Sequence, residues 1–136
     1  MINNIITDVE DMHIKFKLRS WLESNPDKLN ELMKLRMRML TEEFSETMDA
    51  YLQGDPEELV DGLIDLVVIA VGTLEMSGVD VNEAWTKVHE ANMSKEVGVK
   101  PGRPNKLGLP DLIKPDNWRA PSHKNNHGNL PEMLSN

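Results

Sequence analysis

The feature that most constrains this chain is a pair of acidic segments on either side of a turn, within residues 41–65. The turn is Gly54-Asp55-Pro56. Carboxylates recur at helical spacing on both sides of it: Glu42, Glu43 and Glu46 before it, and Glu57, Glu58, Asp61 and Asp65 after it. Residues three or four apart share a helix face, so each arm can point at least two carboxylates in one direction. The pattern predicts a helical hairpin with acids on both arms.

Counting outward from the turn places acids of the two arms level with each other. Glu46 and Glu43 lie eight and eleven residues before the glycine of the turn, and Asp61 and Asp65 lie six and ten residues after its aspartate. Four carboxylates at one place repel one another unless a cation is present. Mg²⁺ and Mn²⁺ take oxygen ligands and retain waters for a phosphate-bearing substrate. We therefore expect these four residues to bind Mg²⁺ or Mn²⁺; the alternative is that they are the solvated face of two amphipathic helices.

Composition excludes several classes of protein. The chain has 136 residues, which predicts one domain, and a formal net charge of −8, which argues against a nucleic-acid partner. It has no cysteine and therefore no disulfide, thiolate metal site or cysteine nucleophile. No apolar run is long enough to span a membrane, and the N-terminus does not resemble a secretory leader. We expect a cytoplasmic protein that binds neither membrane nor nucleic acid.

Hydrophobic periodicity predicts four helices, over about residues 5–21, 29–53, 56–76 and 81–93. The third helix is apolar on all sides over residues 66–74 apart from Gly72 and Thr73, so it should be buried in a bundle or in a subunit interface. Glycine destabilises a helix by about 1 kcal/mol relative to alanine. At Gly72 we therefore expect a neighbouring helix to pack closely against this one. The apolar surface exceeds what one chain of this size readily covers, which predicts a homodimer or homotetramer.

The C-terminal third is rich in proline and glycine, which leaves no room for long helices or strands. Apolar residues as far as Trp118 can anchor it as an irregular segment through about Pro121. We thus expect an all-α fold, a four-helix core with a Pro/Gly-rich C-terminal wrap, as one domain over residues 1–121. Residues 122–136 read as a flexible tail.

Three basic side chains near these elements each allow two interpretations. His13 lies beside the apolar stripe of the first helix, where a histidine is more often structural than functional. Arg36 and Arg38 precede the acids by one to two turns. They can pair with acids on the helix surface or contact phosphates beside the metal, and we favour the ion pairs.

Four stretches, taken together and in order, resemble the MazG-like all-α nucleoside triphosphate pyrophosphohydrolases, particularly the short single-domain forms of phages. They are VEDMHIKF at 9–16, the EExxE motif EEFSE at 42–46, DGLID at 61–65 with the apolar run through residue 73, and VHEANMSK at 88–95. The similarity extends over about residues 9–121. It departs from the family pattern twice. The usual ExxD motif could be Glu58 to Asp61, which makes Glu58 the alternative ligand, and Val68 stands where an aromatic residue is often found.

The resemblance implies cleavage between the α- and β-phosphates of a (deoxy)nucleoside triphosphate, giving a monophosphate and pyrophosphate with Mg²⁺ or Mn²⁺ as cofactor. In that scheme Glu42 orients or deprotonates the attacking water, with a plain surface glutamate as the alternative. Lys95 contacts phosphate and takes part in catalysis. Further substrate contacts would come from Asn92, Lys114, Trp118 and, with core packing as its alternative, His13.

Two other functions remain open from the sequence. The same fold could act on phosphoribosyl-ATP or on dUTP, because the acidic motif recognises phosphates and not the base. A non-catalytic helical interaction module would use the acids as a solvated face and the apolar helix as a dimer seam.

Overall fold

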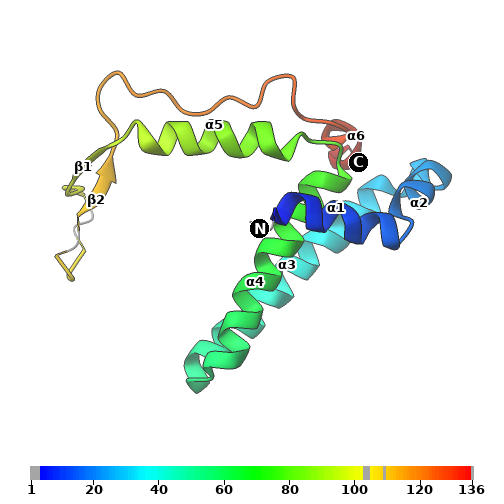
Figure 1. The fold of residues 1–136 in the computed structure, drawn as a ribbon, viewed down its shortest axis with the longest axis horizontal. Helices are drawn as coiled ribbons and strands as arrows, with labels where there is room; N and C mark the ends of the chain where they lie inside the picture. The colour runs from blue at the N-terminus through cyan, green and yellow to red at the C-terminus, as the bar shows by residue number, and fades with distance from the viewer. Residues whose placement is uncertain (1–3, 103–104, 109, 136) are drawn as a thin grey trace. The chain divides into compact units, whose positions relative to one another are not determined.

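The computed structural model describes residues 4–102, 105–108 and 110–135. Its elements, in chain order, are α1 (Ile5–Lys15), α2 (Leu18–Ser24), the 3-10 turn η1 (Pro26–Lys28), α3 (Leu29–Gln53), α4 (Pro56–Met76), α5 (Val81–Met93), β1 (Glu96–Gly98), β2 (Asp111–Ile113) and α6 (Leu130–Leu134) (Figure 1). The described residues are mostly helical and hold one small antiparallel sheet. The predicted all-α fold class is confirmed.

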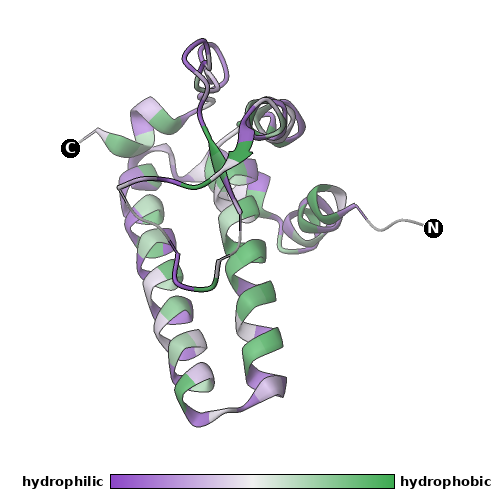
Figure 2. Cartoon of the chain, turned by 90° about the vertical axis from the view of Figure 1, so that its left-hand side faces the viewer, coloured by the Kyte–Doolittle hydropathy of each residue, from purple (hydrophilic) through white to green (hydrophobic). Residues whose placement is uncertain are grey.

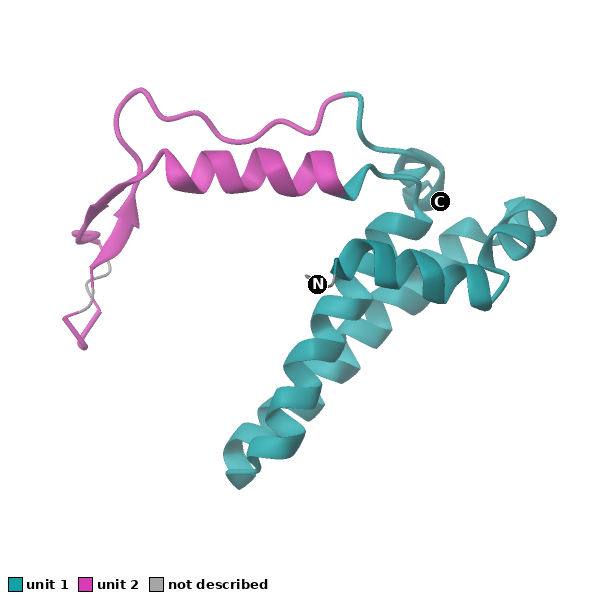
Figure 3. Ribbon diagram, viewed as in Figure 1, with its two compact units in different colours: residues 1–81, 125–136 teal, residues 82–124 magenta. Residues whose placement is uncertain are grey.

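The chain divides into two compact units (Figure 3). Unit 1 comprises residues 1–81 and 125–136, and unit 2 comprises residues 82–124. This division differs from the single domain expected over residues 1–121. The helix expected as the fourth member of the core, α5, belongs to unit 2, and the C-terminal residues belong to unit 1.

The antiparallel hairpin of α3 and α4 is the main body of unit 1, and both helices have the bounds predicted from the sequence (Figures 1 and 2). The turn between them is encoded locally. Gly54 ends α3 in the left-handed conformation, with φ 67°, which glycine adopts without strain. Asp55 caps α4 by accepting a hydrogen bond from the Glu58 amide, and Pro56 takes the first helical position, where no amide proton is needed.

The first predicted helix, over about residues 5–21, is in fact two helices. Lys17 adopts a left-handed conformation, with φ 56°, between α1 and α2. The redirected α2 brings Arg19 to the Glu75 carboxylate of α4. Hydrophobic periodicity does not indicate this break, because the ion pair that accompanies it joins Arg19 to Glu75, 56 positions further along the chain.

Helix α4 is the most hydrophobic long helix, and Figure 2 shows its apolar colouring along most of its length. One face is buried, with Ile69, Gly72 and Met76. The opposite stripe is not covered within the single chain: the residues at helical spacing Val60, Leu63, Ile64 and Val67 are 40–65% exposed. The sequence predicts that this helix is buried either in a bundle within one chain or in a subunit interface. For this stripe, burial within one chain does not hold.

Gly72 is approached closely, as predicted, but by side chains. A Cβ at this position would lie 2.7 Å from Nη2 of Arg36 and 3.3 Å from Nε2 of His13. The glycine thus makes room for a histidine from α1 and an arginine from α3 against α4.

The C-terminal residues are not the flexible tail predicted for residues 122–136. Helix α6 packs against α3, and Met133 is only 1% exposed. The Asn30 side chain donates hydrogen bonds to the backbone oxygens of Met133 at 3.0 Å and Ser135 at 2.9 Å. The Asn129 amide donates to Ser77 O at 2.6 Å. Composition missed this docking because one buried methionine and a few backbone contacts are enough to hold the segment.

Unit 2 consists of α5, the β1–β2 ribbon and the segment that returns along α5. Glu96 pairs with Ile113 and Gly98 with Asp111 in the ribbon. The Trp118 indole N–H donates to Ala91 O of α5 at 2.8 Å, which fixes the returning segment on the helix. Across the described parts of both units, no helix combines the length and apolar character needed to cross a bilayer.

Candidate active site

The four residues predicted to bind metal lie on the α3–α4 hairpin, where three of them influence the ionisation of the fourth. The pKa of Glu43 is raised first by partial burial and then by the charges of Asp65 and Glu46. A hydrogen bond with Asp65 and the charge of Asp61 add to it. Carboxylates from both arms therefore interact, as the count from the turn predicted. A raised carboxyl pKa is the expected result of like charges held close without a counter-ion.

The spacing of the two helices at this point is set by Thr47 and Gly62. A Cβ at Gly62 would lie 2.4 Å from Thr47 Oγ1 and 3.2 Å from its Cβ, so only glycine allows this approach. Thr47 is itself buried, and its hydroxyl donates to Glu43 O at 2.7 Å. Gly62 directly follows Asp61, and the hydroxyl bond holds the turn of α3 that carries Glu43. Helix packing and carboxylate placement are therefore linked.

The four carboxylates suit a hard divalent cation in donor type. All donors are oxygens, the preferred ligands of Mg²⁺ and Mn²⁺. Glu43 and Asp65 are half-buried, whereas Glu46 and Asp61 are exposed and free of packing restraints. As the side chains stand, no three acidic or histidine groups of the described residues converge closely enough to coordinate one ion. Binding a cation would thus require the exposed pair to change rotamer.

The other acids of the hairpin lie outside this interacting group. Glu58, the alternative ligand, lines a cavity of about 230 Å³ near the turn, together with Glu46, Asp49 and Asp55. It is not among the groups that perturb the pKa of Glu43. Glu42 is exposed, one residue away from Glu43 on α3. The groups that influence Glu43 are therefore Asp65, Glu46 and Asp61, and Glu58 lies nearer the turn, in the cavity that Glu46 also lines.

His13 occupies a structural position, the alternative given for it. It is buried between α1 and α4, and its Nδ1 pairs with one carboxylate oxygen of Glu75 while Arg19 pairs with the other. A buried carboxylate needs such partners. Glu75 was not predicted as a buried ion-pair partner, although one signal was available: it is the acid at the end of the apolar second half of α4.

Arg36 makes a different set of contacts from the surface ion pair we favoured. Its Nε donates to Thr73 Oγ1 at 3.0 Å and its Nη2 to Ile69 O at 2.9 Å, both neutral acceptors on α4. Burial lowers the pKa of this guanidinium. Arg38 is exposed, and neither arginine forms a salt bridge within the described residues.

Four of the predicted substrate contacts gather inside unit 2. Lys95 Nζ donates to Asn92 Oδ1 at 3.1 Å and lies 5.3 Å from the centroid of the Trp118 ring. Lys114 Nζ lies 4.8 Å from the same centroid. These residues form a lysine–tryptophan cluster, comprising Asn92, Lys95, Lys114 and Trp118.

Comparison with known proteins identifies a family for the chain. The profile described as phosphoribosyl-ATP pyrophosphohydrolase matches residues 9–92, more than half of the sequence. The match includes the whole α3–α4 hairpin and its carboxylates, and it ends before Lys95, Lys114 and Trp118. No curated protein sequence shows significant similarity to the chain. The chain therefore belongs to the phosphoribosyl-ATP pyrophosphohydrolase family, within the MazG-like all-α superfamily of nucleoside triphosphate pyrophosphohydrolases.

Proposed function

We propose that this nucleotide pyrophosphohydrolase hydrolyses a ribo- or deoxyribonucleoside triphosphate to the monophosphate and pyrophosphate, with Mg²⁺ or Mn²⁺ as cofactor. Family membership makes the chain an enzyme of this reaction class and sets aside the non-catalytic interaction module. The observation that supports metal dependence is the raised pKa of Glu43, which reflects burial first and then the neighbouring charges of Asp65, Glu46 and Asp61.

In this proposal the residues of the chain have three roles. Glu43, Glu46, Asp61 and Asp65 would hold the metal, which supplies charge stabilisation at phosphate oxygens and a more acidic bound water. Glu42, one residue from the group, would orient that water or accept its proton. Thr47 and Gly62 hold the two arms at the spacing on which this group depends.

Two narrower substrates remain as alternatives. Phosphoribosyl-ATP is favoured by one observation, the description of the family whose profile matches residues 9–92. A dUTP-selective enzyme has no specific feature in its favour, because the carboxylates act on phosphates. His13, which would contact the base in our sequence-based scheme, is buried against Glu75.

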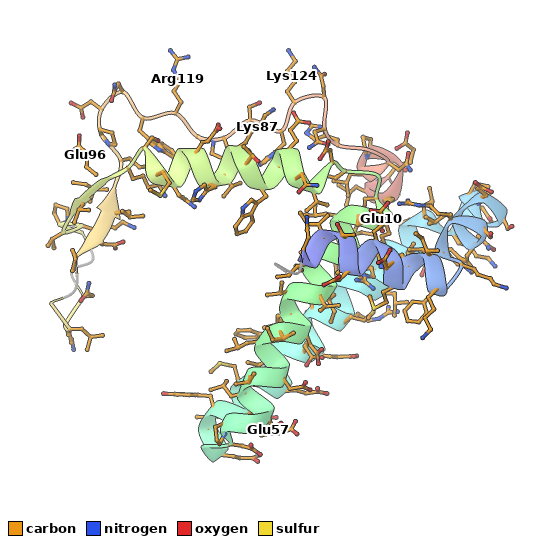
Figure 4. All side chains as sticks on the ribbon, viewed as in Figure 1. Glu10, Glu57, Lys87, Glu96, Arg119 and Lys124 are labelled. Carbon is orange, nitrogen blue, oxygen red and sulfur yellow. The ribbon has the colours of Figure 1, made fainter. Side chains whose placement is uncertain are left out.

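The test is a panel of the common NTPs and dNTPs plus phosphoribosyl-ATP, with and without Mg²⁺, in which monophosphate and pyrophosphate are quantified. We expect pyrophosphate release from one or a few substrates, lost in Glu46→Ala. Glu57→Ala is the matched control, because Glu57 lies at the turn end of the hairpin, away from the interacting group (Figure 4). Release of inorganic phosphate alone, or equal turnover by both variants, would contradict the proposal.

We also propose that the chain assembles as a homodimer or homotetramer through α4. The exposed stripe of Val60, Leu63, Ile64 and Val67 supports this, since an uncovered apolar helix face of this kind marks an interaction surface. Analytical ultracentrifugation of Ile64→Lys should show a smaller species than wild type. Val97→Lys is the control because Val97 is also an exposed apolar residue but lies in unit 2. A wild-type monomer would refute the proposal. A cytoplasmic location without nucleic-acid partners stays a prediction from composition.

A further inference from the structure

The C-terminal latch, residues 125–135, is attached where the chain passes between the two units. The chain enters unit 2 after Val81 and returns to unit 1 after Lys124 (Figure 3). On the unit 1 side, the two passages are bonded to each other. The buried Asn126 side chain accepts a hydrogen bond from the Asp80 amide at 2.8 Å and donates one to Asp80 O at 2.9 Å. One amide group thus ties together the two ends by which unit 2 is connected.

The latch also fits closely against the end of α4. The Asn129 amide donates to Ser77 O at 2.6 Å, and Ser77 is fully buried. A Cβ at Gly128 would overlap Ser77 O and lie 2.6 Å from the carbonyl carbon of Gly78, so only glycine permits this approach. Gly128 has φ 52°, a left-handed conformation that glycine adopts without strain. The sequence of the latch therefore specifies its contact with α4.

The latch is held by few interactions compared with the α3–α4 hairpin. Of its residues, only Asn126 and Met133 are buried. Helix α3 adds two hydrogen bonds from the Asn30 side chain, to the backbone oxygens of Met133 and Ser135. Helix α6 has five residues, too few for a helix to be stable without its packing. Segments with little buried apolar surface open more readily than a packed core, so the latch should open while the hairpin stays folded.

We propose that the C-terminal latch restrains the motion of unit 2, with Asn126 as the positioning residue. The closed latch holds the backbone of Asp80, directly before α5 begins, and so restricts rotation in the connection between α4 and α5. An open latch leaves both connections of unit 2 free to move separately. The catalytic consequence rests on the proposed function: unit 2 carries Asn92 and Lys95, which we expect to contact substrate, and restraint reduces the number of arrangements that compete with binding.

The first measurement is hydrogen exchange of the full-length chain, followed at the amides of Asp80 and Met133. We expect both to be protected to the same degree, and less than amides at the centre of α3 and α4, because the latch opens as one unit. Asn126→Ala should speed exchange at both about ten- to a hundredfold, as loss of buried hydrogen bonds does, and leave the hairpin amides unchanged. Asn129→Ala is the matched control, because Asn129 bonds Ser77 through its backbone amide, which alanine retains.

The second measurement is the distribution of distances between two spin labels, at Glu57→Cys in unit 1 and Thr86→Cys in unit 2. Both positions are exposed, and the chain has no cysteine of its own. Asn126→Ala and Gly128→Ala should each widen the distribution. Asn129→Ala and Gly102→Ala should not, since a Cβ at Gly102 would meet open space. Equal widths in all variants, or faster exchange at Asp80 without any change at Met133, would overturn the latch.

Steady-state kinetics test the positioning role. Asn126→Ala should raise KM for the nucleotide several-fold and leave kcat and Mn²⁺ affinity unchanged, because the restraint acts on substrate contacts and not on the carboxylates of the hairpin. An unchanged KM, or a parallel loss of kcat and Mn²⁺ binding, would contradict that role. If no nucleotide is hydrolysed, the proposed function fails, and the exchange and distance measurements still decide whether the latch restrains unit 2.

Discussion

Replacing Gly62 by alanine tests whether close helix approach positions the candidate metal ligands. The new methyl carbon would stand 2.4 Å from Thr47 Oγ1 and 3.2 Å from Thr47 Cβ, both well inside normal contact. Rotation of the threonine would relieve the contact only by breaking its hydrogen bond to Glu43 O. The arms must therefore move apart or a buried bond must be lost.

The size of the effect follows from two opposing contributions. Overpacking a tight contact costs about 1–3 kcal/mol. Alanine is favoured over glycine in a helix interior by about 1 kcal/mol. We expect a net loss of up to about 2 kcal/mol in the free energy of unfolding, a fall in Tm of up to roughly 8 °C for a domain of this size.

The assay is thermal and urea unfolding of Gly62→Ala, Thr47→Ala and the double variant, each with and without Mg²⁺. In the double variant the obstructing hydroxyl is gone, so the alanine should cost almost nothing, and the coupling should be about 1–2 kcal/mol. Mg²⁺ should stabilise wild type more than Gly62→Ala, because the variant separates Asp61 from Glu43. Higher stability of Gly62→Ala than of wild type, or the same change in stability in both the Thr47 and the Thr47→Ala backgrounds, would contradict a tight contact between Gly62 and Thr47.

Three other perturbations have defined outcomes. Because burial and neighbouring carboxylates raise the pKa of Glu43 above its ordinary value, its contribution to stability is present below the unfolded-state pKa and is lost as the pH rises through the folded-state pKa. Urea unfolding from about pH 4 to 7 should show this fall, and the fall should be flatter in Glu43→Gln. Glu75→Ala should destabilise by about 1–3 kcal/mol in urea unfolding, because the buried imidazole of His13 loses its partner, and an unchanged midpoint would contradict this. Met133→Ala should cost about 2–4 kcal/mol, whereas the exposed Leu134→Ala should stay within about 0.5 kcal/mol; equal effects would mean that the C-terminal residues are not docked.

Local signals made the hairpin predictable from the sequence. The glycine, aspartate and proline of its turn each have a conformational role that depends on neighbouring residues alone, so the bounds of α3 and α4 followed. The count outward from that turn also placed Glu43 level with Asp65, because the rise per residue is constant in both helices. The interaction between carboxylates of the two arms could therefore be predicted from the sequence.

Features that depend on distant partners were not predictable in the same way. The break at Lys17 accompanies the pairing of Arg19 with Glu75, far along the chain. The docking of α6 depends on the buried Met133, in a C-terminal segment that is mostly polar before this short helix. Arg36 finds neutral acceptors on α4 because Gly72 leaves room for its side chain. Each of these results from tertiary packing that local periodicity does not encode.

The most direct test of the central claim is a titration of the protein with Mn²⁺, read by electron paramagnetic resonance as the loss of the free-ion signal. We expect saturable Mn²⁺ binding by wild type, strongly weakened in Glu43→Gln and Asp65→Asn and unchanged in Glu57→Gln. Absence of binding by wild type, or the same loss in Glu57→Gln as in Asp65→Asn, would show that the cross-hairpin carboxylates are a solvated helix face and not a metal site.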